Sequence, residues 1–301
     1  MTDMTEPGLS VIMSERRQLI NLAYRLLGSL ADAEDVVQET YARWYAMTLP
    51  ERHAIENPAA WLTKVASRIC LDQLRSARAR RERYVGEWIP EPLPEHVDGL
   101  GVPDGSTDPA DRVTLDESVN MAFLVVLDAM TPAERVSFIL HDVFRYPFPE
   151  VAEIVGRTPA ACRQLASSAR RRIRESQTPA PPSAREAELV RAFKAAWEAT
   201  DIRALVELLD PAVVATADGG GIVSATLKPI HGIQAVAESF SRLTVVLHGR
   251  QISERTVNGQ PGLVIEFEGT VETVVAFDFA GDLIGNIWAI RNPEKLHPWT
   301  N

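Results

Sequence analysis

The chain has 301 residues, of which 46% are hydrophobic, and this is enough apolar material for two or three cores. No apolar run approaches the ~20 residues of a membrane-spanning helix, and no secretory signal opens the chain, so the sequence predicts a cytoplasmic protein. The formal net charge of −10 excludes a uniformly basic nucleic-acid-binding surface, although the charge is unevenly distributed.

Cysteine and histidine usage argues against disulfides and metals. Cys70 and Cys162 fall in separate predicted helices far apart in the chain, and a disulfide framework needs more than this. The six histidines are scattered, and none stands at a metal-ligand spacing from a cysteine or another histidine. The sequence therefore implies no metal site and no cofactor.

Residues 10–84 have the pattern of a helical domain. Ser29 and Asp32 form a capping-box-like start to a helix whose first turn is acidic. A later helix opens at Asn57, the expected cap, with Pro58 in the first turn, where a missing N–H costs nothing.

The helix that follows Pro58 carries a basic segment over residues 64–83. Only Asp72 and Glu82 are acidic there. The basic residues are Lys64, Arg68, Arg75, Arg78, Arg80, Arg81 and Arg83. Such a segment can neutralise phosphates even though the chain as a whole is acidic.

Residues 85–111 are predicted to be a linker, because prolines and glycines recur too often for a continuing helix or a central strand. Trp88, Ile89 and Leu93 nevertheless lie on this stiff stretch, which cannot bury them against itself. We expect these side chains to dock on another part of the protein, since Trp is costly to leave in water. A loose linker with an exposed Trp is the alternative.

Residues 112–177 are again helical and end in the pattern of a helix-turn-helix. Val151, Ile154 and Val155 have the i, i+3, i+4 spacing of a one-faced helix. Gly156 can end that helix in the left-handed conformation, and Thr158 can cap the next helix.

The second helix of this motif, from about Pro159 to Glu175, has a basic outer face. The predicted buried stripe consists of Ala161, Leu165, Ala169 and Ile173. The side chains turned outward are Arg163, Gln164, Ser167, Arg170, Arg171 and Arg174. This face is expected of a recognition helix in a DNA major groove, whereas the alternative is a solvated basic helix that closes a bundle.

Residues 183–301 are predicted to form a separate α+β domain after a proline-rich break. A helix is expected from Ala184 to Leu209, followed by β-branched runs with glycine punctuation. Two of these runs meet across Ala280-Gly281-Asp282, which indicates a hairpin.

Several features of the helical part occur together in one known arrangement. They are the acidic-start helix with Asp35-Val36-Val37-Gln38-Glu39, the helix from Trp61-Leu62 to Asp72-Gln73-Leu74-Arg75, a variable linker and the C-terminal helix-turn-helix. In this combination the chain resembles a bacterial sigma factor of the extracytoplasmic-function type. The resemblance implies two all-α domains, called region 2 and region 4, over residues 10–84 and 112–177.

The resemblance also implies core RNA polymerase and promoter DNA as partners, while an anti-sigma protein is neither implied nor excluded. The positions that match the polymerase-docking helix are Asp35, Val36, Gln38 and Glu39. Those that match the helix facing the −10 element are Lys64, Arg68 and Arg75. At the −35 element, Arg163, Gln164 and Ser167 match base-reading positions, and Arg170, Arg171 and Arg174 are expected at phosphates. The alternative for Asp35 and Glu39 is that their side chains are simply solvated and compensate the helix dipole.

Residues 183–301 resemble the SnoaL-like, nuclear-transport-factor-2-like domain, a cone-shaped α+β fold that one sigma subgroup carries as an extension. The matching motifs are Trp88-Ile89-Pro90-Glu91-Pro92, Asp218-Gly219-Gly220-Gly221 and Asn292-Pro293-Glu294-Lys295-Leu296. Ile222 stands where the family has a lysine, so no role of that lysine is carried over. We expect the Trp88 motif to dock near the Asp218 loop and the domain to act as a regulatory clamp.

The chain is not expected to be an enzyme. Asp218, His231, His248 and Asp278 are the acid–base candidates of the last domain, and no pair has a spacing that brings acid and base together. The alternative function is a one-component DNA-binding regulator whose cone binds or converts a small molecule. Such a regulator would bind duplex DNA alone, whereas the acidic balance here predicts weak binding until polymerase presents both basic surfaces together.

Overall fold

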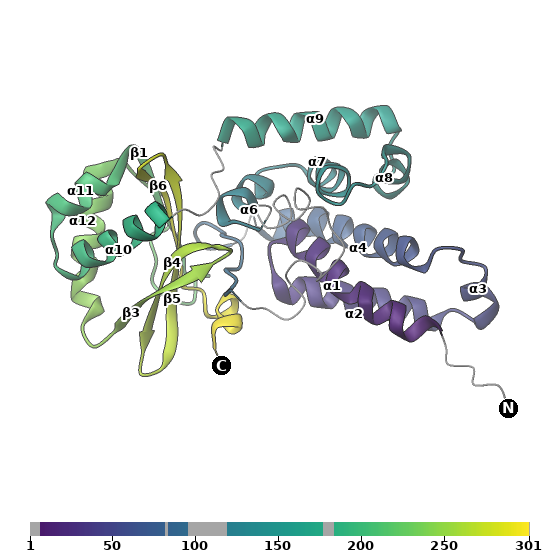
Figure 1. The fold of residues 1–301 in the computed structure, drawn as a ribbon, viewed down its shortest axis with the longest axis horizontal. Helices are drawn as coiled ribbons and strands as arrows, with labels where there is room; N and C mark the ends of the chain where they lie inside the picture. The colour runs from purple at the N-terminus through teal and green to yellow at the C-terminus, as the bar shows by residue number, and fades with distance from the viewer. Residues whose placement is uncertain (1–6, 82–83, 96–118, 177–183, 301) are drawn as a thin grey trace. The chain divides into compact units, whose positions relative to one another are not determined.

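The structure, a computed structural model, describes residues 7–81, 84–95, 119–176 and 184–300 and divides into two compact units (Figure 1). The first unit contains the described parts of Met1–Ala79 and Leu127–Glu175. The second contains those of Arg80–Val97, Asp116–Val126 and Ser176–Asn301. Most of both predicted helical regions thus shares one unit, while residues 119–126 and the described part of the predicted linker group with the C-terminal domain. The predicted boundaries at 111–112 and 177–183 lie outside the described residues.

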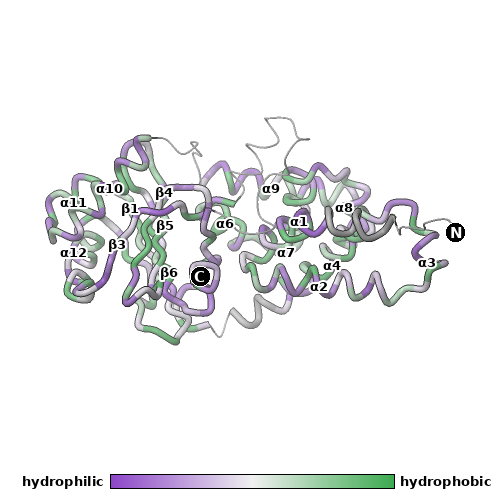
Figure 2. The backbone as a smooth tube through the Cα atoms, turned by 60° about the horizontal axis from the view of Figure 1, so that its bottom comes forward, coloured by the Kyte–Doolittle hydropathy of each residue, from purple (hydrophilic) through white to green (hydrophobic). Residues whose placement is uncertain are grey.

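The first unit is built from helices. They are α1 (Pro7–Leu27), α2 (Leu30–Ala46), α3 (Leu49–His53), α4 (Pro58–Arg81), α7 (Pro132–Phe138), the π-helical turn η1 (Ile139–Val143), α8 (Phe148–Val155) and α9 (Pro159–Ser176). Hydrophilic and hydrophobic stretches alternate along these helices (Figure 2), as expected where one face of each helix is buried. The predicted cap of α2 is present, since Ser29 Oγ accepts a hydrogen bond from the Asp32 N–H at 3.2 Å.

The helix-turn-helix is confirmed in its details. Val151, Ile154 and Val155 of α8 are buried. Gly156 ends α8 in the left-handed conformation, with φ 71° and ψ 42°. Thr158 Oγ1 accepts a hydrogen bond from the N–H of Ala161 at 3.2 Å and so caps α9.

The buried stripe of α9 differs from the predicted one. Cys162, Ala166 and Ala169 are buried, whereas Ala161, Leu165 and Ile173 are only half-buried. Small side chains allow close helix packing, so the line of closest approach follows them and leaves the larger apolar residues at its edge.

The second unit contains a six-stranded sheet with the strand order β2-β1-β6-β5-β4-β3. The strands are β1 (Leu209–Asp218), β2 (Ile230–His231), β3 (Gln251–Val257), β4 (Gln260–Phe267), β5 (Thr270–Ala280) and β6 (Leu283–Ile290). Its other elements are α10 (Ala184–Glu198), α11 (Ile202–Leu208), α12 (Ile233–Leu243), and the 3-10 turns η2 (Thr244–Leu247), η3 (Pro293–Lys295) and η4 (His297–Trp299). Strands β5 and β6 pair antiparallel, which confirms the predicted hairpin, and β1 pairs parallel with β6.

The helix expected from Ala184 to Leu209 is two helices. The chain turns between α10 and α11 at Thr200, which has a positive φ of 57°. Asp201 then caps α11 by accepting hydrogen bonds from two backbone N–H groups. An Asp that competes for backbone donors favours a helix start over a helix interior, and this ended the predicted helix early.

Both faces of the sheet are covered. Because side chains alternate along a strand, Val275 and Phe277 face the core beneath α10 and α12, while Val274 and Ala276 face the opposite core. That opposite core contains linker residue Ile89, which is 2% exposed, together with Met121 from the first turn of α6 (Met121–Asp128). The linker therefore completes the sheet domain.

Candidate functional site

The outer face of α9 presents the polar side chains that the sequence predicts. Arg163, Gln164, Ser167, Arg171 and Arg174 are exposed. Within the helix-turn-helix, the Arg163 guanidinium lies over the ring of Phe148, 5.3 Å from its centroid. This contact limits the side-chain positions that Arg163 can adopt.

Arg170 differs from its neighbours. It is half-buried, and its Nε donates to Asp142 of η1 at 2.6 Å. The charge of Arg170 is thus paired with an acid of the same unit, and a DNA phosphate would have to compete with Asp142 for it.

The basic face of α4 is engaged by the helix-turn-helix. Lys64 Nζ forms an ion pair with Glu153 of α8, with 2.5 Å between Nζ and Oε2. Arg68 Nη2 donates to the backbone carbonyl of the same Glu153 at 3.0 Å. The ion pair holds the pKa of Glu153 below its usual value. Arg75, two helical turns after Arg68, instead forms an ion pair with Asp72 on its own helix, with 3.2 Å between Nη1 and Oδ1.

Further contacts join the two helical regions inside the first unit. Arg135 of α7 is buried and donates to the backbone carbonyl of Leu26, at the end of α1, at 2.8 Å. The same guanidinium forms an ion pair with Asp128 at 2.9 Å. Burial lowers the pKa of Arg135 to about 10, which still leaves it charged at neutral pH.

The residues expected to contact polymerase lie on α2. Asp35, Gln38 and Glu39 are exposed and border a shallow depression with Ile69 of α4. Val36 is fully buried, and this corrects its assignment to the contact surface. Val36 belongs to the buried face of α2, and its packing fixes the helix that presents the acids.

In the second unit, the linker is clasped at Asp218. Its buried carboxylate accepts hydrogen bonds from Tyr84 Oη at 2.6 Å, from the N–H of Ile89 at 3.0 Å and from Lys295 Nζ at 2.6 Å. Lys295 Nζ also donates to the carbonyl of Ile89 and lies 4.1 Å from the ring centroid of Trp88. The predicted docking of the Trp88 motif near the Asp218 loop is thus present.

The glycines after Asp218 and the terminal motif complete this clasp. Asn292 Nδ2 donates to Tyr84 Oη at 3.0 Å, and the Gly220 N–H donates to Asp218 Oδ1 at 3.0 Å. A methyl group on Gly220 would lie 2.5 Å from the Asn292 side chain, so only glycine fits there. Burial, followed by the hydrogen bond to Asp218, raises the pKa of Tyr84.

A second set of contacts holds the proline-rich half of the motif. Leu93 and Asn258 form two hydrogen bonds. The Leu93 N–H donates to Asn258 Oδ1 at 3.0 Å, and the Asn258 N–H donates to the Leu93 carbonyl at 2.9 Å. Trp299 Nε1 donates to the carbonyl of Pro92 at 2.8 Å. Pro90 and Pro92 are buried. Tyr84, Asn258 and Trp299 carry no signal in the sequence, because each bonds the backbone or carboxylate of a residue far away in the chain.

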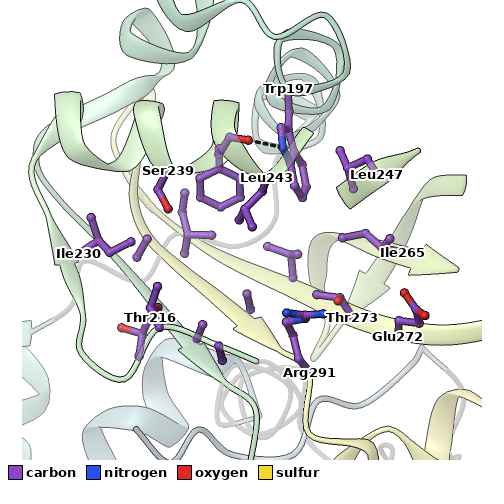
Figure 3. Close-up of a pocket in the computed structure, with 18 of the residues that line it drawn as sticks. Trp197, Thr216, Ile230, Ser239, Leu243, Leu247, Ile265, Glu272, Thr273 and Arg291 are labelled. Atoms are coloured by element: carbon purple, nitrogen blue, oxygen red, sulfur yellow. Dashed lines mark hydrogen bonds between the residues drawn. The ribbon is translucent and has the colours of Figure 1, made fainter. Parts of the chain in front are cut away.

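The acid–base candidates do not meet. Asp218 belongs to the clasp, while Asp278 accepts a hydrogen bond from Asn286 at 3.1 Å. His231 and His248 are both exposed. The sheet domain does contain a cavity of about 290 Å³, and none of these four described residues lines it (Figure 3).

None of the helices in the described segments combines the length and apolarity that crossing a bilayer requires. Over the same segments, no three His, Cys, Asp or Glu side chains gather where they could hold a metal ion.

Two helical modules, one ending in a helix-turn-helix, joined to a sheet domain define a promoter-recognition factor. Residues 11–80 match the family model of Sigma-70 region 2, and residues 120–173 match Sigma-70, region 4. The chain is 37% identical to the ECF RNA polymerase sigma factor SigJ of Mycobacterium tuberculosis, over 93% of this chain and 90% of SigJ. It is 33% identical to the probable ECF RNA polymerase sigma factor SigI of the same species, over 97% and 96%.

The fold agrees with these relationships. The crystal structure of Mycobacterium tuberculosis SigJ matches with a TM-score of 0.73 at 33% identity, covering 97% of this chain and 99% of that one. The chain belongs to the extracytoplasmic-function RNA polymerase sigma factors. Such factors are non-enzymatic initiation factors whose regions 2 and 4 bind core RNA polymerase and promoter elements. The predicted family, the two helical regions and the α+β domain are confirmed.

Proposed function

We propose that α9 reads the −35 element and α4 faces the −10 element of the promoters that this sigma factor selects. The supporting observation is the exposed, donor-rich face of α9, where Arg163, Gln164 and Ser167 lie together at the N-terminal half. Arg can form bidentate hydrogen bonds with guanine, and Gln can form them with adenine. Arg171 and Arg174, further along the helix, are suited to contacts with phosphates.

Asp35, Gln38 and Glu39 form the proposed polymerase contact. They are exposed on consecutive turns of α2 and offer acids and an amide around one shallow depression. Acidic side chains there suit a basic partner surface. Because the chain acts on the transcription machinery, we place its function in the cytoplasm.

The contacts at Glu153 give the free protein a closed arrangement. Lys64 and Arg68 are proposed to face the −10 strand, yet both bond a residue of α8. DNA and Glu153 therefore compete for the same two cations, and core polymerase must separate α4 from α8 to open them. This competition adds to the acidic net charge in weakening DNA binding by the free chain.

The sheet domain is proposed to modulate this activity through the linker that it clasps, and to have no catalytic role. The linker connects regions 2 and 4 in the chain, so fixing residues 84–94 on the sheet domain limits how far the two regions can separate. Asp218, His231, His248 and Asp278 contribute no shared acid–base site, which supports a binding role for the domain.

Transcription reconstituted with core RNA polymerase tests the function directly. A template library randomised at the −35 and −10 elements should yield core-dependent transcripts that share one sequence at each element. A gel shift in which the full chain alone binds the selected duplex as tightly as the holoenzyme does would contradict the proposal and favour a one-component regulator.

A second experiment tests the closed arrangement. Glu153→Gln removes the ion pair with Lys64 and should strengthen DNA binding by the free chain, with little change in the holoenzyme. Glu150→Gln is the matched control, because Glu150 is an exposed acid on the same helix. Equal effects of the two substitutions would show that only net charge matters.

A further inference from the structure

The cavity of the sheet domain has two chemically different sides. Trp197, Leu243 and Leu247 form an apolar side, whereas Thr216, Thr273 and Arg291 bring polar groups to the other (Figure 3). Its volume of about 290 Å³ lies near the lower end of the range for small-molecule sites, about 300–1,000 Å³. Such a lining suits a small molecule with one apolar and one polar end.

Arg291 determines which polar group fits. Its side chain extends from the end of β6 toward the other lining residues (Figure 3), and Nη1 donates to the backbone carbonyl of Ser224. The other two charged lining residues neutralise each other, since Arg250 Nε and Glu272 Oε2 form an ion pair at 2.6 Å. Within the described part of the chain, no carboxylate lies at ion-pair distance from Arg291. A half-buried guanidinium with unused donors beside an apolar space is complementary to a carboxylate.

We propose that this cavity binds a small amphipathic monocarboxylate, with its carboxylate on Arg291 and its apolar body against Trp197, Leu243 and Leu247. Thr273 lies beside Arg291 (Figure 3), and the hydroxyls of Thr273 and of Thr216, elsewhere in the lining, can complete the hydrogen bonds of the carboxylate. The ligand is bound and not converted, because Asp218, His231, His248 and Asp278 lie outside the cavity lining and the acid that does line it, Glu272, is paired with Arg250.

The cavity and the clasp share structural elements. The loop of residues 219–227 lines the cavity with Ser224, Ala225 and Thr226. The same loop borders Val85 and Gly86 at the start of the linker, around a second hollow. At the end of β6, the N–H groups of Arg291 and Asn292 donate to the carbonyl of Asp218 at 2.7 and 2.9 Å.

A carboxylate held by Arg291, whose Nη1 also donates to the Ser224 carbonyl of this loop, therefore stabilises the elements that hold the linker. Bound ligand strengthens the clasp by as much as it binds the clasped state more tightly than the released state. This coupling, unlike the binding itself, rests on the proposed regulatory function of the sheet domain.

Binding is tested by calorimetric titration of the full chain with two carboxylates, 4-phenylbutyrate and octanoate, and with their neutral amides. We expect a sub-millimolar dissociation constant for at least one carboxylate and binding at least about tenfold weaker for its amide, because the charged hydrogen bonds are lost. Arg291→Gln should abolish this preference, whereas Arg242→Gln, an exposed arginine of α12 outside the cavity, should preserve it. Absence of carboxylate binding, equal affinity for acid and amide, or an unchanged preference in Arg291→Gln would overturn the site.

A second variant separates loss of the site from loss of the fold. Ala289→Phe fills the cavity without changing any charge, and it should abolish binding while the thermal unfolding of the chain stays cooperative. If Ala289→Phe unfolds the domain, the Arg291→Gln comparison still decides the proposal.

Coupling is measured by hydrogen exchange of the backbone N–H groups of Ile89 and Leu93, which bond Asp218 and Asn258 in the clasp. Saturating 4-phenylbutyrate or octanoate, whichever binds, should slow exchange at both positions in the wild-type chain and not in Arg291→Gln. Unchanged exchange with bound ligand would overturn the coupling and leave the ligand site standing. Slowed exchange without any effect on core-dependent transcription would instead count against the regulatory function of the sheet domain.

Discussion

Asp218→Asn should be the most damaging conservative substitution in the linker clasp. The Asp218 side chain is 0% exposed and its partner Lys295 only 10%. The amide keeps the shape of the carboxylate but presents an NH₂ group where an acceptor is required by Lys295 Nζ and the Ile89 N–H. Removing one member of a buried ion pair costs about 3–5 kcal/mol, because the other charge stays buried without its counter-charge.

This loss is a large fraction of the ~5–15 kcal/mol that stabilises a typical domain. Urea unfolding monitored by circular dichroism should show a lower midpoint for the sheet domain. Proteolysis between residues 84 and 95 should also be faster. Asp282→Asn is the control, since that carboxylate is 81% exposed and its ion pair with Arg185 is worth about 0–1 kcal/mol.

A double variant separates the ion pair from local packing. Asp218→Asn with Lys295→Met removes both charges, and it should recover part of the stability that the single substitution loses. Two results would show that this pair does not hold the clasp. One is that Asp218→Asn lowers the unfolding free energy by less than about 1 kcal/mol. The other is that the double variant loses as much unfolding free energy as the separate Asp218→Asn and Lys295→Met substitutions lose together.

Three further predictions concern base reading, backbone strain and pH. Arg163→Ala in the holoenzyme should lose about 1–3 kcal/mol of discrimination at one −35 position, whereas Arg174→Ala should weaken all promoters alike; a panel of −35 variants checks this, and uniform loss with Arg163→Ala would contradict the orientation of α9. Gly220→Ala, at φ +64° and 2.5 Å from Asn292, should lower the urea midpoint more than Gly259→Ala, where φ is +78° but no atom lies within 4 Å. Burial opposes ionisation of Glu134, but hydrogen bonds from Thr131 and Ser168 outweigh it and lower its pKa below 4.5. The stability that this group contributes is present above that pH and is lost as the pH falls through the lowered pKa. Glu134→Gln should therefore flatten the acid limb of a curve of unfolding free energy against pH, and a curve parallel to that of the wild-type chain would exclude the effect.

The sequence by itself determined the elements whose signals are local. The i, i+3, i+4 spacing in α8, the left-handed Gly156 and the Thr158 cap depend on residues within one or two turns, so they predicted the helix-turn-helix correctly. The need to bury Ile89 and Leu93 likewise followed from a segment too stiff to cover them. The family followed from the combination of such motifs.

Only the tertiary structure decided which side chains are available and what they contact. Arg170 has the same local sequence signals as Arg171, but Asp142 neutralises it. Val36 directly follows the exposed Asp35 in the predicted contact motif, but packing buries it. Tyr84 meets Asp218 across 134 positions of chain, and no periodicity encodes a contact at that separation. The energy of a buried carboxylate depends on every donor that the fold brings to it, and that set exists only once the linker, the loop after β1 and the end of β6 have come together.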